Sequence, residues 1–258
     1  LELNTGTLNL IEARQQLALI QPLWLALLLA AAVAAGHRWF APLLVVTASL
    51  VVQTHFTYVF PTTAAVLCAV VGAVVIARRR LATLLAPLAA ALAVALVCWW
   101  QPLFDWGWRS GNLGRVLSSA GTGDEPIDGV LGVRILGEAG FVPPYVWPGS
   151  MGDVLRSWST PSFGLAVLTL VMWVIVLGVV GVVSPRHPLR PMAAVAMATI
   201  GGSVVAVVNI PPTEQFGVIA QNYYWAWPVA LFAATVVIGA VATRGLVAAR
   251  ARFGRGPT

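Results

Sequence analysis

Long apolar segments of about twenty residues alternate with short polar turns along most of the chain. A helix rises about 1.5 Å per residue, so a segment of that length crosses the roughly 30 Å hydrocarbon core of a bilayer. The pattern predicts an all-α polytopic membrane bundle with seven spans, at Leu17–Ala35, Ala41–Phe60, Thr62–Ala77, Leu81–Cys98, Phe163–Val183, Met192–Val208 and Trp225–Val241.

The apolar stretch from residue 41 to residue 77 is too long for one crossing, since as a single helix it would extend roughly 55 Å. Arginine follows it and precedes it in the sequence, so both of its ends belong on the same side of the membrane. We therefore predict two spans with a turn at Pro61, whose fixed φ and missing N–H suit the first position of a new helix.

A long polar segment, residues 99–160, interrupts the spans and predicts a folded external domain. Pro102 is expected to end or kink the fourth span. The apolar run Val130–Leu136 is expected to pack onto the membrane surface or the bundle. The chain then divides into spans one to four in residues 1–98, the external domain, spans five to seven in 161–241, and a basic tail in 242–258.

The charges separate by side when the chain is threaded through a bilayer. One side receives no acid and ten arginines: Arg38, Arg78, Arg79, Arg80, Arg186, Arg190, Arg244, Arg250, Arg252 and Arg255. The excess of positive charge on cytoplasmic loops makes this side the cytoplasm, with the N-terminus outside and the C-terminus inside. The first sixteen residues are polar and do not resemble a signal peptide, so we expect an earlier span and interpret the chain as the C-terminal portion of a larger membrane protein.

Composition excludes an ordinary soluble domain, because the chain is 59% hydrophobic and only 9% charged. A net charge of +6 would suggest nucleic-acid binding in a soluble protein, but the cytoplasmic arginine turns account for it here, and we expect no nucleic-acid partner. Cys68 and Cys98 lie inside apolar runs and are interpreted as core residues. Abundant arginine without lysine, with many Ala, Val and Gly, is typical of a high-GC bacterium.

Tryptophan concentrates at the side opposite the arginine turns. Eight of the eleven tryptophans are predicted there: Trp99, Trp100, Trp106, Trp108, Trp147, Trp158, Trp225 and Trp227. An aromatic belt at the lipid headgroups explains most of them. Trp106 and Trp108 alternate with Asp105 and Arg109, a pattern that also fits a site for a sugar or a lipid headgroup.

Polar residues near the end of the second span are candidate site residues. Gln53, Thr54, His55 and Tyr58 lie in apolar sequence, where polar groups must face protein or water. At about 100° per residue, Thr54, His55 and Tyr58 share one helix face while Gln53 points away. His55 has two interpretations, a packing histidine bonded to a carbonyl or a donor to a phosphate or sugar hydroxyl.

A second candidate group follows the fourth span. Asn112 is predicted to cap a short helix that runs through Ser119, with Arg109 and Arg115 nearby. The free N–H groups of that helix end and the two arginines would form an anion-binding site. The alternative is a capped interfacial helix whose arginines contact lipid phosphates. We predict that Arg109, Arg115 and His55 line one cavity that opens to the outer leaflet.

The densest acidic cluster is Asp124, Glu125 and Asp128 in a Gly-rich loop. Such a cluster could hold a divalent cation, although solvated loop acids seldom do so without further ligands. No cofactor is otherwise indicated.

The residues Gln53-Thr54-His55-Phe56-Thr57-Tyr58, followed by Trp100-Gln101-Pro102-Leu103 and Gly111-Asn112-Leu113, give the chain a family resemblance. It resembles the multi-span glycosyltransferase-like proteins of actinobacteria, which are GT-C-type enzymes related in architecture to the protein mannosyltransferases and aminoarabinose transferases. The resemblance covers roughly residues 15–120. It departs from the family pattern where Gln101 directly precedes Pro102 and where Trp106 replaces a commonly polar residue.

The resemblance implies transfer of a sugar from a polyprenyl-phosphate donor to an acceptor outside the cytoplasmic membrane. For that reaction we expect Arg109, Arg115 and the predicted helix end at Asn112 to bind the phosphate, His55 and Tyr58 to orient the donor or acceptor, and Asp105 to be a polar member of the site. Such enzymes carry a catalytic acid in their first external loop. The only acidic residues before Leu17 in this chain are Glu2 and Glu12, and we assign the role of catalytic base to neither of them.

Two other classes of function remain. A transporter is disfavoured because no inverted repeat is visible and His55 is the only ionisable residue within the predicted spans. A non-catalytic scaffold subunit, or a degenerate fragment that binds a partner, is compatible with the missing first loop. The partners expected from the sequence are therefore the polyprenyl-phosphate lipid, bulk membrane lipids and a missing N-terminal part or partner subunit.

Overall fold

The computed structural model describes residues 18–108, 129–137, 162–184, 188–209 and 220–253, and within these ranges the chain forms helices and no strand. The α-helices are α4 (Ile20–Ala34), α5 (Ala41–Thr54), α6 (Val59–Ala77), α7 (Leu85–Trp108), α9 (Gly129–Leu136), α11 (Phe163–Val183), α12 (Leu189–Asn209) and α13 (Ala226–Phe253). Short 3₁₀ helices precede four of them: η1 (Arg38–Phe40), η2 (Phe56–Tyr58), η3 (Leu81–Leu84) and η5 (Ala220–Tyr223).

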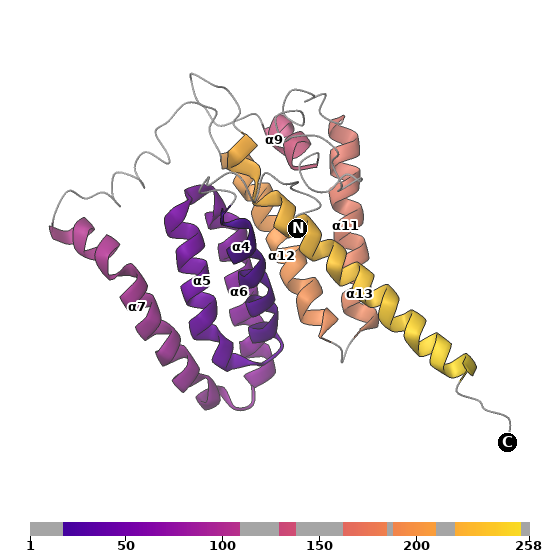
Figure 1. Cartoon of the computed structure of the whole chain (residues 1–258), viewed down its shortest axis with the longest axis horizontal. Coiled ribbons are helices and arrows are strands. Elements are labelled where there is room, and N and C mark those ends of the chain that lie inside the picture. The colour runs from indigo at the N-terminus through magenta and orange to yellow at the C-terminus, as the bar shows by residue number, and fades with distance from the viewer. Residues whose placement is uncertain (1–17, 109–128, 138–161, 185–187, 210–219, 254–258) are drawn as a thin grey trace.

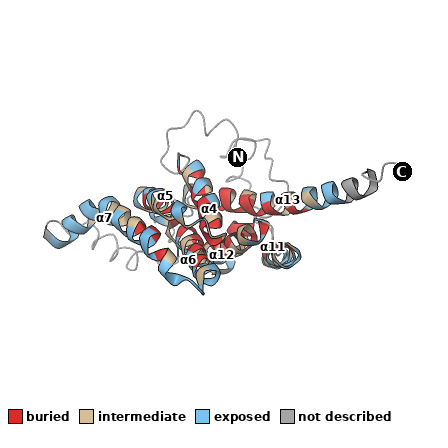
Figure 2. Cartoon of the chain, turned by 90° about the horizontal axis from the view of Figure 1, so that it is seen from below, coloured by how far each residue is buried: buried red, intermediate tan, exposed pale blue. Residues whose placement is uncertain are grey.

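Helices α4 to α7 run antiparallel to their chain neighbours, and α11, α12 and α13 complete the bundle (Figure 1). Helix α12 is central, because it packs against α6, α4, α11, α13 and α9. Figure 2 shows buried residues concentrated around α4, α6 and α12, whereas α7 and the C-terminal part of α13 are largely exposed. The core therefore lies between α4, α6, α12 and the first half of α13.

The helices have the length and composition of membrane spans. Among the described residues, five helical segments are long and apolar enough to cross a bilayer: Phe56–Ala77, Leu81–Gly107, Phe163–Val183, Leu189–Asn209 and Ala226–Val247. Two shorter apolar helices, Ile20–Ala34 and Arg38–Thr54, correspond to the first two predicted spans. The outer surfaces of the helices are apolar, as Val97 and Val182 illustrate with 78% and 79% exposure. The prediction of an all-α multi-pass membrane bundle is confirmed.

The bundle has two distinct ends. We call one the arginine-rich end: it carries Arg38 between α4 and α5, Arg78, Arg79 and Arg80 between α6 and α7, and Arg190 at the start of α12. It is the lower end in Figure 1. The opposite end carries the connection between α5 and α6 and the C-terminus of α7.

The connection between α5 and α6 differs from the prediction. Helix α5 ends at Thr54, His55 adopts an extended backbone with φ −152° and ψ 117°, and α6 begins at Val59. The turn therefore lies at His55, and the predicted turn at Pro61 is wrong. Pro61 is the third residue of α6, where its missing N–H costs nothing because the first turn of a helix has no internal acceptors.

Helix α7 does not end at Pro102 but continues to Trp108, so of the two expectations for Pro102, an end or a kink of the span, the first is wrong. A proline inside a helix cannot donate to the carbonyl four residues earlier, which here belongs to Cys98. The amide Nε2 of Gln53 on α5 donates to this Cys98 oxygen at 2.9 Å. The neighbouring helix thus satisfies the group that Pro102 leaves free, as is typical of prolines in membrane helices.

The apolar run at residues 130–136 belongs to α9, which packs against α12 and α11. Gly132, Ile135 and Leu136 are buried in this contact. The expectation that this part of the predicted external domain packs onto the bundle is confirmed.

Candidate functional site

The break between α5 and α6 forms the centre of the candidate site. The imidazole Nδ1 of His55 lies 2.8 Å from the hydroxyl of Thr57, and this local hydrogen bond competes with continuation of the helix. The His55 ring also meets the edge of Tyr58, with ring centroids 5.9 Å apart and planes at 75°. Since the backbone is extended at His55, the predicted shared helix face of Thr54, His55 and Tyr58 is wrong. The pairing of His55 with Tyr58 nevertheless exists.

Tyr58 connects this break to the beginning of α13. Its side chain is completely buried, and the buried Tyr224 lies nearby. Tyr224 stacks on Trp227 at 5.1 Å between centroids, and Tyr223 lies 6.5 Å from Trp225. We call His55, Tyr58, Tyr223 and Tyr224 the aromatic cluster; its polar groups lie in an otherwise apolar bundle.

Thr62 lies one helical turn after Tyr58 and adds a buried hydroxyl near this cluster. Its side chain is only 2% exposed, and its Oγ1 has no hydrogen-bond partner within the described residues. Buried hydroxyls are normally paired, so Thr62 is an exception among the described residues.

Gln53 and its neighbour Ser49 have a structural role instead. While Gln53 donates to the Cys98 carbonyl, the indole Nε1 of Trp99 donates to Ser49 Oγ at 3.0 Å. Together these two bonds attach α7 to α5 near the middle of α7. The amide nitrogen of Gln53 is thereby engaged, which explains a polar residue in this apolar sequence without any ligand.

Asp105 lies in the last turns of α7 and is half-buried. It is seven residues past Cys98, and therefore about 10 Å further along the helix axis. Because α5 ends at Thr54, just beyond Gln53, Asp105 lies past the end of α5. Asp105 is thus at the same end of the bundle as His55, on a different helix.

The remaining predicted site residues lie outside the described residues. These are Arg109, Asn112 and Arg115, together with the acidic cluster Asp124, Glu125 and Asp128. The convergence of Arg109 and Arg115 with His55 and the divalent-cation site stay predictions. Within the described ranges, no group of three His, Cys, Asp or Glu side chains could hold a metal ion.

The predicted belt of tryptophans divides into two groups. Trp100 and Trp106 are 67% and 55% exposed, as expected for side chains at a lipid interface. Trp225 is completely buried, and its Nε1 donates to the carbonyl of Asn222 at 2.7 Å. The interpretation of Trp225 as a belt residue is therefore wrong.

Sequence reasoning missed two cavities at the arginine-rich end. One, of about 380 Å³, has Arg38, Arg79 and Arg80 in its lining. The other, of about 590 Å³, lies between α4, α6 and the start of α12, with Arg190 in its lining. These arginines were interpreted only as markers of the cytoplasmic side. The sequence did contain one indication of a shared site, because the turn at residues 36–38 and the turn at 78–80 are predicted on the same side of the membrane.

Comparisons of the chain with protein-family models, with curated proteins and with solved structures returned no match.

Proposed function

We propose that the protein is a glycosyltransferase of the cytoplasmic membrane, or part of one, that uses a polyprenyl-phosphate sugar. The observation that carries this proposal is the break between α5 and α6. It puts the half-buried imidazole of His55 at one end of an apolar bundle, where a lipid-linked substrate could reach it from the bilayer, with the buried ring of Tyr58 packed against it. The family resemblance of residues 53–58 concerns the same segment.

In the proposed reaction, a base removes the proton of an acceptor hydroxyl, whose oxygen forms a bond to the anomeric carbon of the donor sugar. The bond between that carbon and the lipid phosphate breaks, and the phosphate leaves with the electron pair. His55 orients the substrates and Tyr58 supports it through their ring contact. Arg109, Arg115 and the helix end that the sequence predicts at Asn112 bind the phosphate, and Asp105 is a polar member of the site. Gln53 is omitted because its amide nitrogen holds α7.

The proposal places the aromatic cluster on the outer side of the membrane, which labelling can test. We expect an impermeant maleimide to label Gly123→Cys but not Gly245→Cys in intact cells, because cytoplasmic loops carry the arginines. Both probes are placed in a chain with Cys68 and Cys98 replaced by alanine. Equal labelling at the two positions would contradict the orientation and the outer location of the site.

His55→Ala is expected to lower sugar transfer by roughly 10- to 100-fold, since a lost hydrogen bond to a charged phosphate costs about 1.5–3 kcal/mol. The measurement is chromatography of radiolabelled polyprenyl-phosphate sugars after incubation with the full chain in phosphatidylcholine nanodiscs. His37→Ala is the matched control, because His37 is an exposed histidine at the arginine-rich end. Unchanged transfer by His55→Ala would contradict the proposed role.

A scaffold subunit is the second candidate function. Helix α7 favours it, because this long helix packs mainly against α5 and presents a largely exposed apolar surface. If the full chain bound the polyprenyl-phosphate sugars without turning any of them over, this second function would replace the first.

A further inference from the structure

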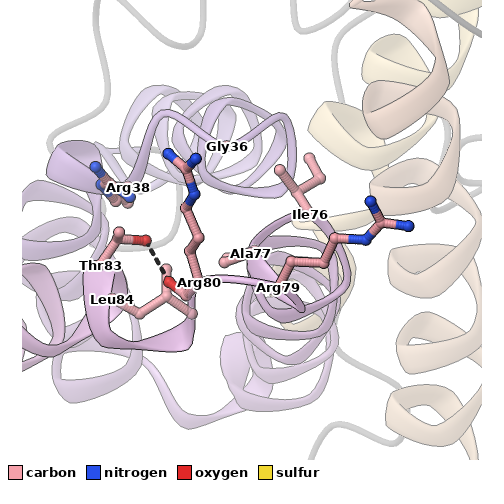
Figure 3. Close-up of a pocket in the computed structure, with 9 residues that line it drawn as sticks. Gly36, Arg38, Ile76, Ala77, Arg79, Arg80, Thr83 and Leu84 are labelled. Atoms are coloured by element: carbon pink, nitrogen blue, oxygen red, sulfur yellow. Dashed lines mark hydrogen bonds between the residues drawn. The ribbon is translucent and has the colours of Figure 1, made fainter.

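The cavity lined by Arg38 and Arg80 is formed where two helical hairpins meet. Its walls are the turn after α4 at Gly36, the start of η1, the end of α6 and the end of η3 (Figure 3). Apolar side chains form the interior, among them Ala73, Ile76 and Leu84. The cavity thus combines an apolar interior with cationic side chains, at the end of the bundle where all three connecting turns are basic.

The end of α4 has a backbone geometry that places Arg38 here. Gly36 has φ +97°, its N–H bonds to Val33 O, and the N–H of His37 bonds to Ala32 O. This pair of bonds is the Schellman arrangement, which needs a left-handed residue and so favours glycine. The chain reverses at Gly36 and brings Arg38, which is half-buried, to the cavity.

On the other hairpin, the backbone of Arg80 is held by Thr83, whose hydroxyl donates to the Arg80 carbonyl at 2.7 Å. In Figure 3 the Arg80 side chain extends toward Gly36 with Arg38 to its left, whereas Arg79 points to the opposite side. Two positive side chains from different hairpins therefore approach the same space.

The charges around this cavity favour an anionic ligand. Arg38 and Arg80 stand at the N-terminal ends of the helical segments Arg38–Thr54 and Leu81–Gly107, where the helix dipole favours negative charge. The only acid among the described residues is Asp105, at the opposite end of the bundle. No carboxylate of the described chain therefore neutralises the two guanidinium groups.

We propose that this cavity binds the phosphate headgroup of an anionic phospholipid. Guanidinium groups match phosphate oxygens in pairs of parallel hydrogen bonds, and basic pockets between membrane helices bind such headgroups. The apolar side chains of the cavity continue onto the lipid-facing surface of α6 at Ile76, which is 59% exposed, so acyl chains can leave along that helix. The proposal does not rest on sugar transfer, and it holds for either orientation of the protein.

The test uses the full chain in phosphatidylcholine nanodiscs with increasing fractions of phosphatidylglycerol or cardiolipin. Native mass spectrometry counts the anionic lipids that stay bound. We expect one saturable site, weakened about fivefold by Arg38→Gln or Arg80→Gln and about twenty-five-fold by the double variant. Arg244→Gln, which removes the same charge from an exposed position on α13, should change binding by less than about twofold.

A further variant distinguishes binding inside the cavity from non-specific electrostatic attraction of anionic lipids to the arginines. Thr83→Phe keeps every arginine but fills the cavity, and it should abolish the saturable site. If Thr83→Phe bound the lipid normally, or if Arg244→Gln weakened binding as much as Arg38→Gln, the proposal would be wrong. Saturable binding of inorganic phosphate with no preference for anionic phospholipid would also overturn it, because the ligand would then be a free phosphate.

Discussion

Trp225→Ala is expected to lower the free energy of unfolding by about 3–5 kcal/mol, the cost of truncating a large buried aromatic side chain. The Trp225 side chain has no solvent exposure and lies beside Tyr223 in the core near the beginning of α13. The variant also leaves the Asn222 carbonyl without the indole N–H that it accepts at 2.7 Å. Trp225→Phe should lower the free energy of unfolding by less than Trp225→Ala does, because phenylalanine keeps most of the ring volume.

The measurement is denaturation of the full chain in mixed micelles, followed by circular dichroism. Trp100→Ala is the matched control, because Trp100 is 67% exposed and lies at the same end of the bundle. We expect it to change the free energy of unfolding by no more than about 0.5 kcal/mol. Equal losses in both variants would mean that Trp225 acts as an interfacial anchor after all.

Gly202→Ala is expected to destabilise the bundle by about 1–3 kcal/mol, although alanine is normally the better helix former. A Cβ at Gly202 would lie 2.7 Å from the Phe60 carbonyl oxygen and 2.8 Å from the Ala64 Cβ. Because the nearest atom belongs to the backbone of α6, the added methyl group must push α12 and α6 apart. This is the close approach through small residues that membrane helices use for packing.

The adjacent residue is the control for this prediction. A Cβ at Gly201 would meet nothing within 4 Å, so Gly201→Ala should be neutral or stabilise by up to about 1 kcal/mol. The same denaturation assay compares the two variants. If Gly202→Ala were as stable as Gly201→Ala, the described contact between α6 and α12 would be wrong.

The sequence by itself determined the helices and the class of fold. A membrane helix satisfies its own backbone hydrogen bonds, so its existence depends only on a local run of apolar residues of sufficient length. For that reason the predicted spans agree with the apolar helices apart from their ends. The grouping of Arg38 with Arg80 at one end also follows from the sequence, since consecutive spans alternate in direction.

Only the tertiary structure decided which polar residues are structural and which could bind a ligand. Gln53 contacts the Cys98 carbonyl 45 positions away, and Trp99 contacts Ser49 50 positions away, which no local pattern contains. Trp225 and Trp100 have similar sequence surroundings, but neighbouring helices cover only the first. The cavity at Arg38 and Arg80 likewise exists only where two hairpins meet. The physical reason is the same in each case, because burial and hydrogen bonding between helices depend on which helices become neighbours.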